Sequence, residues 1–225
     1  DVLPESEKLL PVFLQEKGYQ TALFGKLHVS GRSFERDNRN PDDGFEIYEY
    51  AMTPHSMGGR YNSYSDWLQK NQPEFYEKLK SKDKTHGNIP IEAHFTNWAA
   101  ERTIDFLRNH DISRPFFCCM SVVDPHDPYS DYPVEMLDSV EQSQIAEPVK
   151  DHNLEERPQA VQLESEHGYL GGFNNYTKEQ IRQMRIGYYA SVAFLDQQIG
   201  RVLDVLSENG LGDKTLVIFT SDHGD

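Results

Sequence analysis

Three apolar segments of this 225-residue chain are each followed directly by a histidine with a lysine or an aspartate close beside it. These polar groups are Gly25-Lys26-Leu27-His28 after residues 19–24, Asp124-Pro125-His126-Asp127 after residues 115–123, and Ser221-Asp222-His223-Gly224 after residues 215–220. Each group taken alone is also a common surface turn. Because the carboxyl ends of parallel strands meet at one edge of a sheet, we expect the three groups to form one site.

The residue types of this expected site suit an anion held beside a metal ion. Lys26 supplies a compact positive charge, and His28 and His126 supply directed N–H donors, so these three side chains can bind an oxyanion. Asp222 and His223 are residue types that ligate divalent cations. An anion site beside a metal favours hydrolysis of a phosphate or sulfate ester, because both parts neutralise the charge that develops in the reaction.

The three apolar segments are predicted to be strands of one sheet. Residues 19–24 form a short run between Gly18 and Gly25, whereas residues 115–123 and 215–220 are continuous apolar runs. Such runs are typical of strands buried on both faces. Helical patterns lie between them, so the predicted fold class is α/β, with a mostly parallel sheet flanked by helices on both faces.

Apolar residues at three- and four-residue steps predict three clear helices. The first lies within residues 5–17, carries an apolar stripe of Leu9, Leu10, Phe13 and Leu14, and is expected to begin near Pro11. The second covers about residues 96–109. The third and longest runs from about 177 to 209, where Thr177 and Gln180 fit a capping box.

Two stretches have no such pattern. Residues 30–90 and 130–175 are rich in Gly, Pro, Asn and Asp, and the second is also acidic. We expect them to be long loops around the rim of the site, with one helix within residues 67–80.

Composition excludes several function classes. The net charge is −15, from 22 Lys and Arg against 37 Asp and Glu, which argues against nucleic acid as a partner. No apolar run approaches the roughly 20 residues needed to span a bilayer. The only cysteines, Cys118 and Cys119, are adjacent, so they form neither a disulfide framework nor a CxxC metal site. We expect one thiol on each face of a buried strand.

Three stretches of the sequence, taken in their order along the chain, resemble motifs of the sulfatase family of the alkaline phosphatase superfamily. The matching stretches are residues 18–28 (the family's GYxTxxxGKxH), Pro115-Phe116-Phe117 through Pro125-His126-Asp127-Pro128-Tyr129 (PFF…PHxPY), and Tyr188-Tyr189-Ala190 through residues 215–224 (YYA…LD…G…G…TLVIFTSDHG). Each stretch is moderately specific, and the set is highly specific. The resemblance extends from about residue 9 to residue 225.

The resemblance implies that residues 1–225 are part of one sulfatase catalytic domain with an alkaline phosphatase-like fold. It implies that Lys26, His28 and His126 bind the sulfate group and take part in catalysis, with His126 also assisting the leaving oxygen. Asp222 and His223 would be metal ligands. Calcium is the family's usual metal, and a histidine ligand leaves magnesium or manganese open. The implied substrate is a sulfate ester of a sugar or aryl alcohol, either a small molecule or a glycan.

The sequence also departs from the family. Family members begin with a strand that carries paired Asp metal ligands, followed by a Cys-x-Pro/Ala-x-Arg segment whose Cys or Ser becomes the formylglycine nucleophile. Neither segment is found here, nor is the family's small C-terminal subdomain. We therefore expect an internal fragment that is inactive on its own, with the formylglycine outside this chain. Family members are often periplasmic, secreted or lysosomal, and the sequence leaves the compartment open.

Two other functions remain open at this stage. One is a phosphonate monoester or phosphodiester hydrolase of the same superfamily, because residues 92–98 resemble a stretch that some sulfatases share with those enzymes. The Lys26-x-His28 pair favours a sulfatase over that reading. The other is a catalytically dead paralogue that binds sulfated glycans, which the missing nucleophile segment permits.

Overall fold

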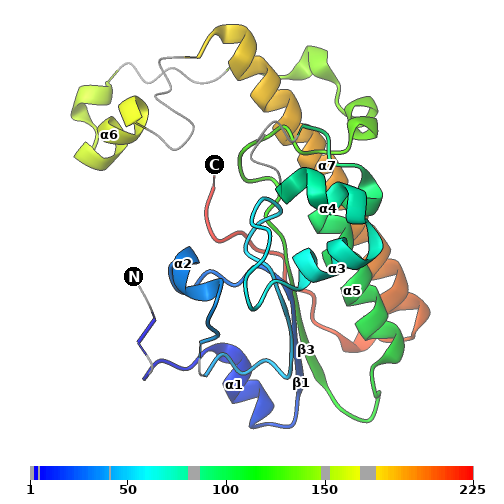
Figure 1. The fold of residues 1–225 in the computed structure, drawn as a ribbon. Coiled ribbons are helices and arrows are strands. Elements are labelled where there is room, and N and C mark those ends of the chain that lie inside the picture. The colour runs from blue at the N-terminus through cyan, green and yellow to red at the C-terminus, as the bar shows by residue number, and fades with distance from the viewer. Residues whose placement is uncertain are drawn as a thin grey trace.

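A parallel sheet of three strands organises the part of the chain that the structure describes. The structure is a computed structural model that describes residues 3–4, 6–40, 42–80, 87–147, 153–167 and 176–224. Its strands are β1 (Gln20–Gly25), β2 (Ile47–Tyr50) and β3 (Phe116–Ser121), in the order β2-β1-β3 (Figure 1). β1 pairs in parallel with both neighbours, so the predicted parallel α/β arrangement is confirmed.

The helices differ widely in length. The α-helices are α1 (Leu10–Gln15), α2 (Arg32–Glu35), α3 (Ser63–Asn71), α4 (Pro73–Lys80), α5 (Phe95–Asn109), α6 (Gln159–His167) and α7 (Lys178–Glu208). Short 3₁₀ turns cover Ile91–Ala93, Val134–Ser139, Gln142–Gln144, Leu154–Glu156 and Gly212–Lys214. None of the described helices is both long and apolar enough to cross a membrane.

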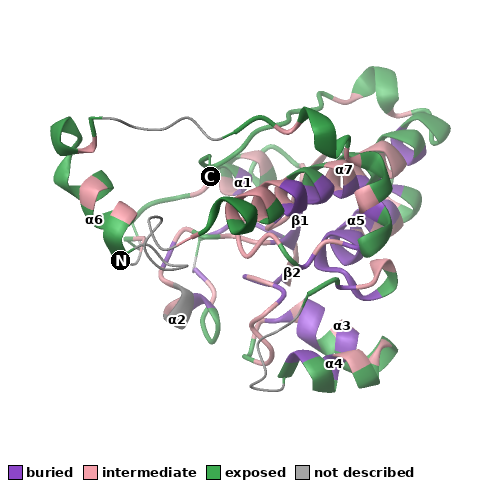
Figure 2. Ribbon diagram, turned by 90° about the horizontal axis from the view of Figure 1, so that it is seen from above, coloured by how far each residue is buried: buried purple, intermediate pink, exposed green. Residues whose placement is uncertain are grey.

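The two faces of the sheet pack against different parts of the chain, because neighbouring strand residues point to opposite faces. On one face, Phe24 packs with Ile104 of α5 and Leu206 of α7. On the other face, Leu23 packs with Phe45 and with residues after β2. Figure 2 shows that buried positions gather on α5 and β1, whereas α6 has no buried residue. Two long helices therefore cover one face, and irregular segments cover most of the other.

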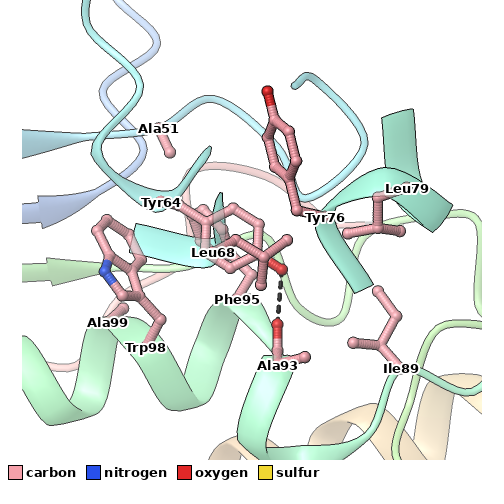
Figure 3. Close-up of a cluster of buried hydrophobic side chains, with 10 residues drawn as sticks. All are labelled: Ala51, Tyr64, Leu68, Tyr76, Leu79, Ile89, Ala93, Phe95, Trp98 and Ala99. Atoms are coloured by element: carbon pink, nitrogen blue, oxygen red, sulfur yellow. Dashed lines mark hydrogen bonds between the residues drawn. The ribbon is translucent and has the colours of Figure 1, made fainter. Parts of the chain in front are cut away.

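A further apolar cluster fixes the beginning of α5. α3 and α4 pack there, and the cluster includes Tyr64, Leu68 and Trp98, which are fully buried (Figure 3). The Tyr64 hydroxyl donates a hydrogen bond of 2.6 Å to the carbonyl oxygen of Ala93, immediately before α5. The first turn of α5 is therefore held from outside the helix as well as by its own hydrogen bonds.

The long helix follows its sequence signals closely. The Thr177 side chain accepts from the Gln180 backbone N–H, and the Gln180 side chain accepts from the Thr177 N–H, so the capping box is confirmed. α1 likewise has Pro11 in its first turn, as expected. Its predicted apolar stripe is only partly right, because Leu10 and Phe13 are 59% and 51% exposed.

The prediction of a buried strand over residues 215–220 is wrong for this structure. The segment has no regular secondary structure and is drawn as a red coil without an arrow in Figure 1. Leu216, Val217, Ile218 and Phe219 are 84%, 55%, 74% and 77% exposed. A strand forms only where a neighbouring strand pairs with its backbone, and none of the strands in the described ranges pairs with this segment.

Two other expectations need correction. β3 is shorter than residues 115–123, and all six of its residues are half-buried, because it lies at the edge of the described sheet. Residues 30–90 are not loops alone: they contain β2 and α2, and the expected helix near residue 67 is divided into α3 and α4. The acidic stretch over residues 130–175 is not a loop alone either: residues 130–147 and 153–158 contain short 3₁₀ turns, and α6 follows them. Residues 148–152 and 168–175 lie outside the described residues.

We predict that Gly25→Ala destabilises the full-length protein far more than Gly210→Ala. Both glycines have positive φ, +116° and +67°, so alanine is strained at either position. Only at Gly25 would the new Cβ overlap a backbone atom, the carbonyl oxygen of Ser121. In thermal or denaturant unfolding, the free energy of unfolding should fall by about 1 kcal/mol for Gly210→Ala and by about 3 kcal/mol or more for Gly25→Ala. Equal losses would contradict the argument.

Candidate functional site

β1 and β3 end at the same level, and the candidate site begins there. Gly25 and Ser121 are partners in the strand register. Directly after them, the Lys26 N–H donates to the carbonyl oxygen of Ser121 over 2.8 Å. The chain then continues on one side to His28 and on the other to His126. The rule that polar residues gather beyond the carboxyl ends of parallel strands therefore holds for these two strands.

The five residues that the sequence singles out come together here. Lys26 Nζ lies 3.7 Å from Asp222 Oδ2. His223 Nε2 lies 3.7 Å from the same carboxylate oxygen, and the rings of His126 and His223 are in edge contact with their centres 5.7 Å apart. Asp222 thus lies between Lys26 and His223, although the segment that carries it is not a strand.

Burial and neighbouring charges both shape the electrostatics of this cluster. Desolvation is the main cause that lowers the pKa of His28, and the Lys26 ammonium adds to it; the Asp222 carboxylate opposes this shift, and smaller contributions from His126 and His223 lower the pKa further. Desolvation opposes the ionisation of Asp222, but Lys26 and His223 outweigh it, so the pKa of that carboxyl lies below its ordinary value. Within a chain of net charge −15, Lys26 therefore places an ammonium group beside three imidazole rings and the Asp222 carboxylate.

A carboxylate next in sequence orients His126. Nδ1 of His126 lies 2.8 Å from Oδ1 of Asp127, whose side chain is 13% exposed. An Nδ1–H directed at a carboxylate leaves Nε2 as the nitrogen available to another group. Asp127 was not among the predicted site residues, although its position beside His126 in the sequence is a usable signal.

A buried carboxylate supports the loop that carries Lys26 and His28. Oε1 of Glu35 accepts from the N–H groups of Val29 and Ser30 over 3.0 and 2.7 Å, and Oε2 accepts from the Tyr50 hydroxyl over 3.2 Å. Burial raises the pKa of Glu35, and these hydrogen bonds oppose that shift. Glu35 was also missed, because nothing in its local sequence distinguishes it from the acids around it.

The described residues do not by themselves complete a metal site. Asp222 and His223 offer one carboxylate and one imidazole, and both side chains are largely exposed. Nowhere in the described ranges do three or more His, Cys, Asp or Glu side chains gather in a way that could hold a metal ion. A hard divalent cation takes six or more ligands, so these two residues are at most a part of one.

The two cysteines play no part in this cluster. Cys118 packs on the side of α5 and Cys119 on the opposite side, which confirms one thiol on each face of the strand. Burial raises the pKa of both thiols. Since the thiolate is the reactive form, neither is a suitable nucleophile.

The chain is similar to known sulfatases along its whole length. A family model described as Sulfatase matches residues 1–225. The arylsulfatase of Clostridium perfringens is 36% identical over 132 residues, which cover 59% of this chain and 27% of that protein. The choline-sulfatase of Rhizobium meliloti is 28% identical over 246 residues, which cover 100% of this chain and 44% of that protein.

Solved structures show the same fold. The phosphonate monoester hydrolase of Agrobacterium radiobacter matches with a TM-score of 0.67 at 21% identity, over 94% of this chain and 46% of that one. At this level of identity the likeness shows the fold alone, and it confirms the expected alkaline phosphatase-like architecture. The chain spans less than half the length of each of these three proteins.

We predict that Glu35→Ala loosens the loop behind Lys26 and His28. Hydrogen exchange of the Val29 and Ser30 amides should become about tenfold faster or more, because both lose a buried charged acceptor. Asp37→Ala is the matched control, since Asp37 is exposed and pairs only locally with Arg36 at 3.0 Å. Unchanged exchange at Val29 and Ser30 in the Glu35 variant would show that the loop does not depend on this contact.

Proposed function

Because the chain belongs to the sulfatase family, we propose that the full-length protein hydrolyses a sulfuric ester, of a sugar or an aryl alcohol. One observation carries the proposal: Lys26, His28 and His126 converge on one place from the ends of two paired strands, beside Asp222 and His223. Such a cluster of positive charge and N–H donors suits the oxygens of a sulfate group.

Each residue has a distinct role in this proposal. The Lys26 ammonium neutralises charge on the sulfate oxygens, and His28 supports it as a hydrogen-bond donor. His126, with Nδ1 held by Asp127, donates from Nε2 to the sulfate or to the oxygen that leaves with the alcohol. The carboxylate of Asp127 holds the imidazole ring of His126 in the orientation that turns Nε2 toward the leaving oxygen.

The family implies two further components. A formylglycine supplies the nucleophile and lies outside this chain. A divalent metal, calcium by family precedent or else magnesium or manganese, supplies charge neutralisation. Asp222 and His223 are the two described residues that we assign to it, and the remaining ligands would come from outside the described residues.

A phosphonate monoester or phosphodiester hydrolase is the second candidate. Its support is the shared fold with the Agrobacterium enzyme and the family-like stretch at residues 92–98. A sulfated-glycan-binding protein without turnover is the third. Lys26, His28 and His126, with Asp222 and His223 beside them, form what we call the anion cluster. This cluster alone fits all three candidate functions, whereas the match to the Sulfatase family over the whole chain favours the first.

We predict that the full-length protein turns over 4-nitrophenyl sulfate faster than a 4-nitrophenyl phosphonate. Lys26→Ala and His126→Ala should each lower kcat/KM for the sulfate about 100-fold or more, because each removes a charged or directed contact to the reacting group. The exposed residues Lys17 and His167 provide the controls Lys17→Ala and His167→Ala, which should stay near wild type. Faster phosphonate turnover would favour the second candidate, and sulfate binding without turnover the third.

Chelation should abolish the proposed activity. After treatment with EDTA and removal of the chelator, we expect turnover to return when Ca²⁺, Mg²⁺ or Mn²⁺ is added back, and the most effective ion identifies the metal. Asp222→Asn should prevent this recovery, whereas Asp213→Asn, at an exposed position, should not. Full turnover by protein shown to be free of metal would contradict the metal assignment.

A further inference from the structure

A loop of eight residues, 124–131, carries His126, and we call it the His126 loop. Its first residue, Asp124, is buried and accepts a hydrogen bond from the Thr96 hydroxyl in the first turn of α5. Its last residues are tied to the segment before α5: the Asn88 N–H donates to Ser130 O over 2.7 Å, and the Ile89 N–H donates to Asp131 O over 3.0 Å. Both ends of the loop are therefore bound to the same region, which is the start of α5 and the segment before it.

The region that holds the loop is itself tied together by buried contacts. His94 is buried, and its Nδ1 accepts from the Thr96 N–H over 3.2 Å, so it caps α5 while Thr96 holds Asp124. The His94 ring stands edge-on to Phe194 of α7, with the ring centres 4.7 Å apart. At the other end, Asp131 is buried and lies 3.3 Å from Nε2 of His55. None of these contacts belongs to the anion cluster.

The middle of the loop rests directly on α7. A Cβ built at Gly187 would overlap the carbonyl oxygen of Tyr129, and would stand 2.9 Å from its carbonyl carbon and 3.0 Å from the Tyr132 ring. Tyr129 has a positive φ of 33°, a conformation that non-glycine residues rarely adopt. Only a residue without a side chain lets the helix approach the loop backbone this closely. Gly200, on the same helix, has no atom within 4 Å of such a Cβ.

We propose that Gly187 and Thr96 are positioning residues that fix His126 for the reaction: Gly187 by admitting the loop backbone against α7, and Thr96 by holding the start of the loop on α5. This inference rests on the proposed function, since it assigns both residues an effect through His126. Neither residue contacts the anion cluster. An added methyl at position 187 must displace the loop or the helix by about 1 Å, and a displacement of that size can cost about 100-fold in rate.

The test uses matched pairs of variants in the full-length protein. Gly187→Ala is compared with Gly200→Ala, since both replace a glycine within α7 and gain the same helix propensity. Thr96→Val is compared with Thr103→Val, since both remove a buried hydroxyl from α5, but that of Thr103 donates only to Ala99 O in its own helix. Each variant is made in the wild-type and in the His126→Ala background.

We expect Gly187→Ala to lower kcat/KM for 4-nitrophenyl sulfate about 100-fold and Thr96→Val about tenfold, with both controls within about twofold of wild type. In the His126→Ala background, neither Gly187→Ala nor Thr96→Val should cause a further loss, because the residue through which they act is gone. A merely structural role would lower kcat/KM by the same factor in both backgrounds. If Gly187→Ala does not fold, as judged by its thermal midpoint, the Thr96 pair decides alone.

The outcomes separate this inference from the proposed function. If His126→Ala lowers kcat/KM while folded Gly187→Ala and Thr96→Val keep wild-type values, the positioning inference is overturned and the function stands. The same holds if the losses are equal in the two backgrounds. If the wild type does not turn over the sulfate ester, or His126→Ala keeps full activity, the proposed function fails and the inference fails with it.

Discussion

The close pairing of Gly25 with Ser121 is the constraint on which the candidate site depends. At this point two parallel strands end level with each other, and the backbone of one approaches the other so closely that a Cβ has no room. Lys26 then bonds to the same carbonyl oxygen that Gly25 faces. Because both chains leave the sheet at this place, the side chains that follow them must share one edge. Any change in register by one residue would turn Lys26 to another face.

Two buried carboxylates hold the loops of the candidate site, and their described hydrogen bonds do not involve Lys26, His28 or His126. Glu35 binds the backbone behind Lys26 and His28, and Asp124 is bound at the base of the His126 loop. Both are buried, and their partners are N–H and O–H groups rather than the cations of the site. Asp222 is different, because it lies 3.7 Å from Lys26 and its side chain is 67% exposed. The Lys26 side chain of this pair is only 12% exposed, so a bound anion would compete with Asp222 for the same ammonium group.

Sequence patterns predicted the parts of the molecule that depend on local signals. The capping box at Thr177, the two long helices and β1 were all found because their signals lie within their own residues, although β1 also needs the pairing with β2 and β3. The grouping of Lys26, His28 and His126 followed from a general rule about strand ends. Residues 215–220 show the limit of such reasoning: their apolar run indicates what the segment can do beside another strand, but not whether one pairs with it here. β2 was missed for the opposite reason, since its three half-buried residues carry little apolar pattern.

Two of the residues that no pattern revealed, Glu35 and Gly187, share a physical property: they act on backbone rather than on substrate. Glu35 binds amide groups, and Gly187 matters only because a carbonyl oxygen from another segment lies against it. Both loops of the candidate site thus depend on a backbone approach that only glycine permits, at Gly25 for Lys26 and at Gly187 for His126. A side-chain contact can adjust by rotation about χ angles, whereas two backbones in contact cannot. Backbone contacts at both loops therefore hold the geometry of the site more tightly than polar side chains alone would.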